Sequence, residues 1–342
     1  MRTADFDYSL PPELIAQEPV EPRDQARLLV LDRSSGALHH RWVRDLPRLL
    51  SPGDLVVVNR TRVLPARLAG RLASGGRVEV LLLRRVAARR WLALTRPARR
   101  LRAGTLVEVG VSPGLRLRVA AEGEAGLREM VVEPAGTATD AECDALLFQA
   151  GTAPLPPYIR AWAGDPERYQ TMFADEMGSA AAPTAGLHFT PELVGRLADA
   201  GVQLGTIVLH VGLDTFRPVV EEDPAEHPMH SEWYQVSAEV QAGVATARAA
   251  GRRVVAVGTT CVRALEAWAA TGRPEGWTDL FIVPGYEMKV VDALLTNFHL
   301  PRSTLLMLVS AFAGRERILA AYRAAIAQRY RFYSFGDAML IT

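Results

Sequence analysis

The chain has 342 residues, of which 49% are hydrophobic, so it is long enough to bury at least one large core and we expect two domains. The formal net charge is +1, so overall charge neither requires nor excludes a polyanionic partner. The two cysteines, Cys143 and Cys261, lie far apart without the spacing of metal ligands, which argues against a disulfide scaffold and against a bound metal.

The N-terminal segment, residues 1–17, carries acidic residues and prolines where a signal peptide would carry a basic flank and an apolar stretch. No apolar run approaches the roughly 20 residues that a membrane-spanning helix requires. We therefore expect a cytoplasmic protein with no membrane partner. Nothing in the sequence demands an oligomer, so we expect a monomer.

Residues 54–58 predict a buried strand, and the chain that follows to about residue 149 predicts an antiparallel β module. Glycine-containing turns such as Gly75-Gly76 and Pro113-Gly114 separate its short β-like runs, which are residues 77–83, 106–110, 115–120 and 127–133.

Residues 153–160 are rich in proline and extended, which indicates a return connection into an interrupted first domain. We therefore predict a mixed α/β domain made of residues 1–60 and 150–342. An antiparallel, β-rich and barrel-like domain, residues 61–149, is inserted into it.

The start of the inserted module is strongly basic. Thirteen arginines and a single acidic residue, Glu79, lie between residues 60 and 102. Arg60, Arg62 and Arg67 follow the first strand in what we expect to be a basic loop. Arginine binds phosphate through two parallel hydrogen bonds, so an RNA backbone would explain the cluster, and a solvated basic face is the alternative.

From about residue 178 the pattern changes to strands alternating with capped helices, which is typical of an α/β domain. Helix starts are indicated at Thr190-Pro191, Ser237 and Ser303. The strand candidates between them are residues 202–210, 254–258, 280–285 and 293–298.

The run GSAAAPTAGLHF, residues 178–189, is the most informative segment. Pro183 fixes its own backbone, Gly186 allows a sharp turn or a close approach, and His188 titrates near neutrality. These properties favour a preorganised loop that faces a ligand. A tight turn with one hydrogen-bonded histidine is the simpler alternative.

Residues 254–268 predict a strand, a Gly258-Thr259-Thr260 turn and a helix. Such a turn presents backbone N–H groups and two hydroxyls to a carboxylate or another anion, and Arg263, one turn into the helix, could pair with the same anion. Ordinary helix capping is the alternative. Cys261 is better explained as a small buried side chain than as a nucleophile.

Three further histidine-containing runs could contribute to a site. His210 ends a strand and is followed by Asp214 in a loop, which would suit an acid/base pair or a buried structural histidine. His227 and His230 could bind a metal, but no third ligand accompanies them. His299 follows a strand end, ahead of a capped hydrophobic helix.

Glycine-rich nucleotide motifs, both GxGxxG and the Walker A type, are absent from the sequence, which argues against dinucleotide and nucleoside triphosphate chemistry. Taken in order, the motifs resemble the S-adenosylmethionine:tRNA ribosyltransferase-isomerase (QueA) family of queuosine biosynthesis, essentially from end to end. The runs that carry the resemblance are NRTRVLPARL, AAPTAGLHF, LHVGLDTF, MHSE, VGTTCVRALE, NFHLPRSTLLMLVSAFAG and YRFYSFGDAMLI.

The resemblance implies a reaction. The ribosyl group of S-adenosylmethionine is transferred to the aminomethyl nitrogen of 7-aminomethyl-7-deazaguanine at the wobble position of tRNA, and isomerised. The products are epoxyqueuosine-tRNA, adenine and methionine. S-adenosylmethionine is then a consumed substrate rather than a bound cofactor, and tRNA is the partner.

The resemblance also implies site residues. His188 is the leading acid/base candidate, followed by His210 and His299. We expect Arg60, Arg62 and Arg67 to contact tRNA. Contacts with S-adenosylmethionine are expected from Thr184, Gly186, Phe189, Gly258, Thr259, Thr260 and Arg263.

Three positions depart from the pattern of the family, which usually has asparagine at Arg60, serine at Cys261 and glycine at Asp214. Serine at the place of Cys261 argues against a thiol nucleophile, and the departures leave open which roles Arg60 and Asp214 share with relatives. Two other functions remain possible from the residues alone: another S-adenosylmethionine-dependent RNA-modifying enzyme, such as a methyltransferase, and a non-catalytic RNA-binding protein.

Overall fold

The computed structural model describes residues 1–110, 115–134, 136–160, 164–212 and 219–342. The chain divides into two compact units. Unit 1 contains Met1–Arg62, Pro156–Glu176 and Ala182–Thr342, and unit 2 contains Val63–Leu155 and Met177–Ala181. Pro113-Gly114 and Asp214, considered above as a turn and as a possible acid/base partner, lie outside the described residues.

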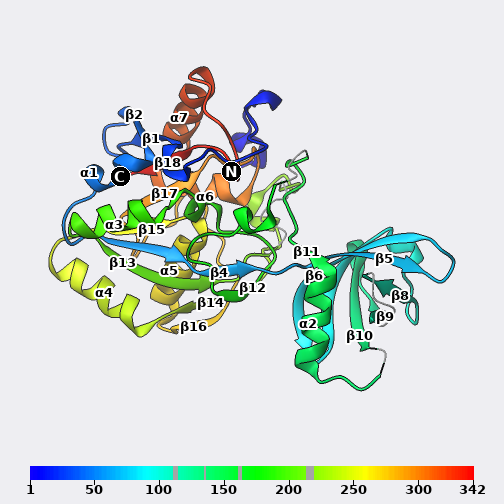
Figure 1. Ribbon diagram of the computed structural model, residues 1–342. Coiled ribbons are helices and arrows are strands. Elements are labelled where there is room, and N and C mark those ends of the chain that lie inside the picture. Colours follow the sequence, from blue (N-terminus) through cyan, green and yellow to red (C-terminus); the bar gives the residue numbers. More distant parts are fainter. Residues whose placement is uncertain (111–114, 135, 161–163, 213–218) are drawn as a thin grey trace. The chain divides into compact units, whose positions relative to one another are not determined.

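Unit 1 is built on a nine-stranded mixed sheet with the strand order β16-β14-β13-β3-β15-β17-β18-β1-β2 (Figure 1). Its four central strands, β13, β3, β15 and β17, run parallel, and β14, β16, β18 and β2 pair antiparallel with a neighbour. The strands are β1 (Arg27–Leu31), β2 (Leu38–Trp42), β3 (Leu55–Asn59), β13 (Gln203–Leu209), β14 (Glu232–Val236), β15 (Val254–Val257), β16 (Glu275–Thr278), β17 (Ala293–Asn297) and β18 (Ala338–Ile341).

Burial on both faces explains why the central strands are continuous apolar runs. Every residue of β3, β15 and β17 is buried. Alternate residues of β3 and β15, such as Val56 and Val257, join Leu193 and Leu197 in one hydrophobic core. The helices of unit 1 are α1 (Leu46–Leu49), α3 (Pro191–Asp199), α4 (Ala238–Ala249), α5 (Thr259–Thr271), α6 (Thr304–Ala313) and α7 (Arg315–Ala327).

The expected helix caps are present. The hydroxyl of Thr190 accepts a hydrogen bond from the backbone of Leu193, and Pro191 occupies the first helical position of α3. Ser237 and Ser303 cap α4 and α6 in the same way. Each cap satisfies a backbone N–H that the helix itself leaves unpaired.

Unit 2 is an antiparallel sheet with the order β11-β5-β6-β7-β10-β9-β8, and an additional pairing of β5 with β8 closes it into a barrel. The helix α2 (Asp140–Ala150) lies against β10 and β11 (Figure 1). The strands are β5 (Arg67–Leu72), β6 (Arg77–Ala87), β7 (Arg90–Arg96), β8 (Leu106–Val109), β9 (Leu115–Glu122), β10 (Leu127–Pro134) and β11 (Gly151–Thr152). A separate two-stranded sheet joins β4 (Thr61–Val63) and β12 (Glu176–Ser179).

The prediction of a mixed α/β fold with an antiparallel barrel is confirmed, but two local expectations are wrong. Residues 280–285 were expected to form a strand, yet they form none, and the strand of this region is β16. Arg62 and Arg67 were expected in a loop, yet Arg62 lies in β4 and Arg67 begins β5. In β5 the buried Leu68 and Gly70 alternate with Arg67, Ala69 and Arg71. A glycine on the buried face and an alanine on the exposed face weaken the apolar/polar alternation by which a half-buried strand is recognised.

Candidate functional site

The run of residues 178–189 ends in a short 3-10 helix, η8 (Thr184–His188), whose side chains face in different directions. Thr184 donates its hydroxyl to the side-chain oxygen of Asn297 at 2.9 Å. Phe189 packs edge to face on Phe173 in the hydrophobic core. Gly186 allows close packing, because a β-carbon there would lie 3.1 Å from the methyl group of Thr171.

His188 is buried behind Asn297, with 3.3 Å between its Nε2 and the amide nitrogen of that residue. Burial lowers the pKa of His188 to about 4, and the positive charge of Arg23 acts in the same direction. The ring is therefore neutral at pH 7.

The turn into α5 has the backbone that the sequence predicts. Gly258 has φ = +88°, a conformation that favours glycine, and the helix begins at Thr259. The hydroxyl oxygen of Thr260 is buried and makes no hydrogen bond within the described residues. An unpaired buried hydroxyl is costly, so a ligand that accepted a hydrogen bond from it would recover that free energy.

The end of β17 supplies a second group of polar side chains. Thr296 Oγ1 and His299 Nε2 lie 2.8 Å apart, and the backbone N–H of His299 donates to the Tyr322 hydroxyl. Burial lowers the pKa of His299 to about 3, so this imidazole is also neutral at pH 7. Asn297 donates to the carbonyl of Tyr333 and thereby connects β17 with the segment before β18.

These segments enclose a cavity, here called cavity 1, with about 520 Å³ of empty space, open solvent included. It combines hydroxyls, an amide and an imidazole with apolar walls. Its lining residues are Tyr158, Ala182, Pro183, Thr184, Ala185, Val211, Gly258, Thr259, Thr260, Thr296, Asn297, Phe298, His299, Leu300, Leu305, Tyr333 and Ser334.

Cavity 1 brings together five of the residues predicted to act in catalysis or to bind S-adenosylmethionine: Thr184, Gly258, Thr259, Thr260 and His299. His188, Gly186 and Phe189 lie in the adjoining η8 region without lining it. Tyr158, Thr296 and Ser334 also line cavity 1, and none of them was predicted as a site residue. Tyr158 could have been predicted, because it lies in the proline-rich segment 153–160 that leads the chain back into the first domain.

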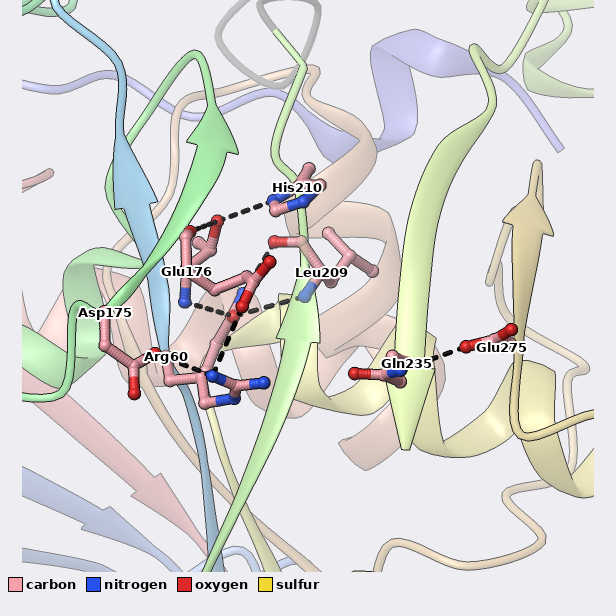
Figure 2. A network of polar contacts seen from close by, with 9 residues as sticks. Arg60, Asp175, Glu176, Leu209, His210, Gln235 and Glu275 are labelled. Atoms are coloured by element: carbon pink, nitrogen blue, oxygen red, sulfur yellow. Dashed lines mark hydrogen bonds and ion pairs between the residues drawn. The ribbon is translucent and has the colours of Figure 1, made fainter. Parts of the chain in front are cut away.

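His210 lies in a different polar network at the end of β13 (Figure 2). Its Nδ1 is 2.8 Å from the Thr61 hydroxyl, and its ring stacks on Trp233 with 5.3 Å between centroids. Burial lowers the pKa of His210, whereas the negative charge of Glu176 acts in the opposite direction. Figure 2 shows Arg60 in the same network, where it binds Asp175 at 2.9 Å and Glu176 at 3.4 Å.

The other two arginines expected to contact tRNA also have protein partners. Arg62 binds both carboxylate oxygens of Glu167, at 2.6 and 2.7 Å. Arg67 donates to the carbonyl of Leu155 at 3.3 Å and lies 4.0 Å from Glu79. The carboxylate partners are substantially exposed, so these pairs are weak and phosphate could replace them.

Arg263 lies outside cavity 1. Its guanidinium forms a buried ion pair with Glu232 and also donates to the carbonyls of Leu280 and Thr278. With Glu232 it lines a second cavity, cavity 2, which has about 570 Å³ of empty space, open solvent included. The expected contact between Arg263 and the same anion as Thr259 and Thr260 therefore has no support from the position of its side chain.

Nucleophilic catalysis by cysteine is disfavoured, because burial raises the pKa of the Cys261 thiol to about 12. Among the described residues there is no group of three or more histidine, cysteine or acidic side chains placed to hold a metal ion. His227 instead binds Glu221, with 2.8 Å between Nδ1 and Oε2. No helix in the described part of the chain is long and apolar enough to cross a membrane.

Known proteins resemble the chain over its full length. Residues 3–341 match the family described as "Queuosine biosynthesis protein". The proteins named S-adenosylmethionine:tRNA ribosyltransferase-isomerase from Symbiobacterium thermophilum and Moorella thermoacetica are 57% and 54% identical to it, and each alignment covers 100% of both chains. The crystal structure of the S-adenosylmethionine tRNA ribosyltransferase from Thermotoga maritima matches with a TM-score of 0.57 and 42% identity, covering 99% of this chain and 100% of that one.

Proposed function

The chain belongs to the queuosine biosynthesis protein family, and from this membership we infer how its residues serve the reaction of the family. It is an S-adenosylmethionine:tRNA ribosyltransferase-isomerase, which transfers and isomerises the ribosyl group of S-adenosylmethionine onto the 7-aminomethyl group of 7-aminomethyl-7-deazaguanine in tRNA. The observation that carries this function is identity above 50% with enzymes of that name over the full length of both chains.

We propose that cavity 1 binds S-adenosylmethionine, with the methionine carboxylate at the start of α5. The N-terminus of a helix favours a negative charge by roughly 0.3 to 1 kcal/mol, and Thr259 and Thr260 add hydroxyl donors. The unpaired hydroxyl of Thr260 supports this placement. The absence of a side chain at Gly258 leaves the backbone there open to a ligand.

The reaction needs a group that moves protons. It begins with removal of a proton from the ribose 5′ carbon, which the neighbouring sulfonium makes acidic. Departure of adenine, attack by the aminomethyl nitrogen and loss of methionine follow. We propose His299 for proton transfer, since its imidazole lines cavity 1 and the Thr296 hydroxyl, 2.8 Å from Nε2, orients the ring.

The other two histidines are proposed for supporting roles. His188 lies behind Asn297, so it would hold that amide and, through it, the wall of cavity 1. His210 would fix the end of β13 through Thr61 and Trp233. Both proposals keep these residues near the site without requiring contact with the reacting atoms.

We further propose that tRNA contacts Arg60, Arg62 and Arg67 and the inserted domain predicted over residues 61–149. Their partly exposed guanidinium groups favour a phosphate backbone, and the carboxylates that they now bind are weak competitors. Since S-adenosylmethionine is consumed, no resident cofactor is required. We propose a cytoplasmic monomer, as tRNA modification enzymes work where tRNA is.

Product analysis tests this function. The protein is mixed with S-adenosylmethionine and tRNA carrying the aminomethyl precursor, and the nucleoside mass is read together with the small products. We expect epoxyqueuosine together with adenine and methionine in equal amounts. S-adenosylhomocysteine would instead identify a methyltransferase, and binding without any consumption would identify an RNA-binding protein.

A further inference from the structure

Cavity 2 is a second enclosed site next to cavity 1, and the two share Leu305 as a wall. It is formed by the segment before β14, by α5, by α6 and by the irregular segment 280–282. Most of its surface is apolar, supplied by residues such as Leu280, Phe281 and Leu308. A flat aromatic ring would suit such walls.

The polar part of cavity 2 is a buried ion pair. The side chains of Glu232 and Arg263 are 7% and 9% exposed. Buried ion pairs seldom add stability, because desolvation of the two charges offsets their attraction. A pair of this kind that lines a cavity is therefore better explained by a bound molecule than by the needs of the fold.

The surroundings hold the Glu232 carboxylate in one orientation. One oxygen accepts from the backbone N–H of Gly212 at 2.7 Å, and the other accepts from Arg263. Arg263 is itself anchored by the carbonyls of Leu280 and Thr278. A carboxylate has about four acceptor positions, so each oxygen can still accept one more hydrogen bond.

Two neighbouring acceptors select a particular kind of base. A guanine-type ring presents two adjacent donors, N1–H and the exocyclic N2 amino group, to a carboxylate. Adenine presents one amino group between acceptor nitrogens, which a carboxylate would repel. Enzymes that modify a base in RNA commonly take it out of the stack and recognise this edge in a closed pocket.

We propose that cavity 2 binds the 7-deazaguanine base of the tRNA substrate, with Glu232 accepting hydrogen bonds from N1–H and the N2 amino group. This inference rests on the proposed function. Because Leu305 lines both cavities, a base in cavity 2 would lie next to S-adenosylmethionine in cavity 1, as transfer of the ribosyl group to the aminomethyl nitrogen requires. Glu232 is thus a residue that determines specificity, and Arg263 positions it.

The test uses anticodon stem-loop RNAs that differ at the wobble position alone, one with guanine and one with hypoxanthine, which lacks the N2 amino group. They compete with precursor tRNA for the wild-type enzyme and for Glu232→Gln. We expect the wild type to prefer guanine by roughly 5- to 150-fold, the range for a bidentate contact with a base. Glu232→Gln should lose this preference and still bind S-adenosylmethionine with an affinity within about twofold.

Phe281→Ala provides a second variant, since Phe281 is only half-buried and its removal should not unfold the chain. It should weaken binding of both RNAs equally and preserve the preference for guanine. Equal binding of both RNAs by the wild type, or weaker binding of S-adenosylmethionine by Glu232→Gln with the preference intact, would overturn the inference. Failure of the proposed function can be distinguished from failure of this inference, because in the former case the wild-type enzyme would release no adenine or methionine from S-adenosylmethionine.

Discussion

His299 and His188 differ in their relation to cavity 1, and this difference assigns them different expected effects. His299 lines the cavity, whereas His188 is buried behind the amide. His299→Asn is expected to lower kcat by roughly 100-fold or more, the usual contribution of a general acid or base. His188→Asn should leave kcat of the folded enzyme within a few-fold and reduce its thermal stability.

Single-turnover release of adenine measures this contrast, with S-adenosylmethionine affinity determined separately for each variant. Loss of adenine release in His188→Asn together with normal release in His299→Asn would reverse the two roles.

The hydroxyl of Thr260 makes possible a nearly isosteric test of the S-adenosylmethionine site. Because this hydroxyl has no protein partner among the described residues, Thr260→Val should leave the free energy of unfolding unchanged or slightly raised. It should raise the KM for S-adenosylmethionine severalfold if the hydroxyl donates to the substrate. Thr246→Val, on the outer side of α4, is the matched control, and an unchanged KM in Thr260→Val would argue against this hydrogen bond.

At the scale of the element, α5 serves both as a wall of the site and as an anchor for a long connection. The buried carboxylate of Glu266 accepts hydrogen bonds from the Tyr286 hydroxyl and from the backbone N–H groups of Lys289, Val290 and Val291. These bonds fix the segment that leads into β17, and therefore the strand that carries Asn297 and precedes His299.

Glu266→Gln replaces one acceptor oxygen with a donor, so at least one of these N–H groups loses its partner. We expect the free energy of unfolding to fall by about 1 to 3 kcal/mol, the cost of an unsatisfied buried donor. Urea denaturation measures the change. The exposed Glu275→Gln serves as the control, and equal stability of the two variants would contradict the anchoring role of Glu266.

The element scale also shows what the sequence could predict. Helix starts such as Thr190-Pro191 and the Gly258-Thr259-Thr260 turn are local signals, and the structure has both. The ion pair of Arg263 with Glu232 could not be predicted, because its partners come from different elements that the sheet brings together. The prediction of a strand over residues 280–285 was wrong because an apolar run can line a cavity as well as form a strand, and residues 280–282 line cavity 2.

At the scale of the whole molecule, buried neutral histidines make stability depend on pH. Burial lowers the pKa values of His188 and His299 to about 4 and 3, whereas an unfolded histidine titrates near 6.5. Between those values the unfolded chain binds protons that the folded chain does not. The free energy of unfolding should therefore be insensitive to these groups above about pH 7 and fall below it, by up to about 1.4 kcal/mol per pH unit for each histidine.

Denaturant unfolding at pH 8, 7, 6 and 5 checks this expectation. In His188→Asn the free energy of unfolding should fall less steeply between pH 6 and pH 5 than in the wild type. An unchanged slope would show that His188 takes up its proton at the same pH in the folded and the unfolded chain.

The charge of the barrel is the second property of the whole molecule. Seven arginines of unit 2 are exposed and, within the described part of the chain, none of them forms an ion pair: Arg71, Arg77, Arg96, Arg99, Arg100, Arg102 and Arg116. The guanidinium of Arg100 lies beside the turn that leads into Arg77, because a β-carbon on Gly76 would lie 3.3 Å from its Nη1. Such a cluster is expected to bind phosphate.

Arg77→Gln with Arg100→Gln is expected to weaken tRNA binding and to reduce its salt dependence. The slope of log K against log salt should fall by roughly 0.7 to 0.9 for each phosphate that the variant no longer neutralises. Filter binding between 50 and 200 mM salt would measure it. Arg90→Gln is the control, since Arg90 already binds Glu129. A slope that matches the wild type would place the RNA elsewhere on the molecule.

The position of β18 in the large sheet has a consequence for how the protein is made. β18 lies between β17 and β1, and it is the last strand of this sheet to leave the ribosome. β1 and β2 are synthesised first and pair with each other, yet the second edge of β1 has no partner until β18 arrives. This hairpin therefore keeps an unpaired edge while the intervening chain, including the barrel, is synthesised. Once β18 has been made, it pairs with β1 on one side and with β17 on the other and so completes the sheet.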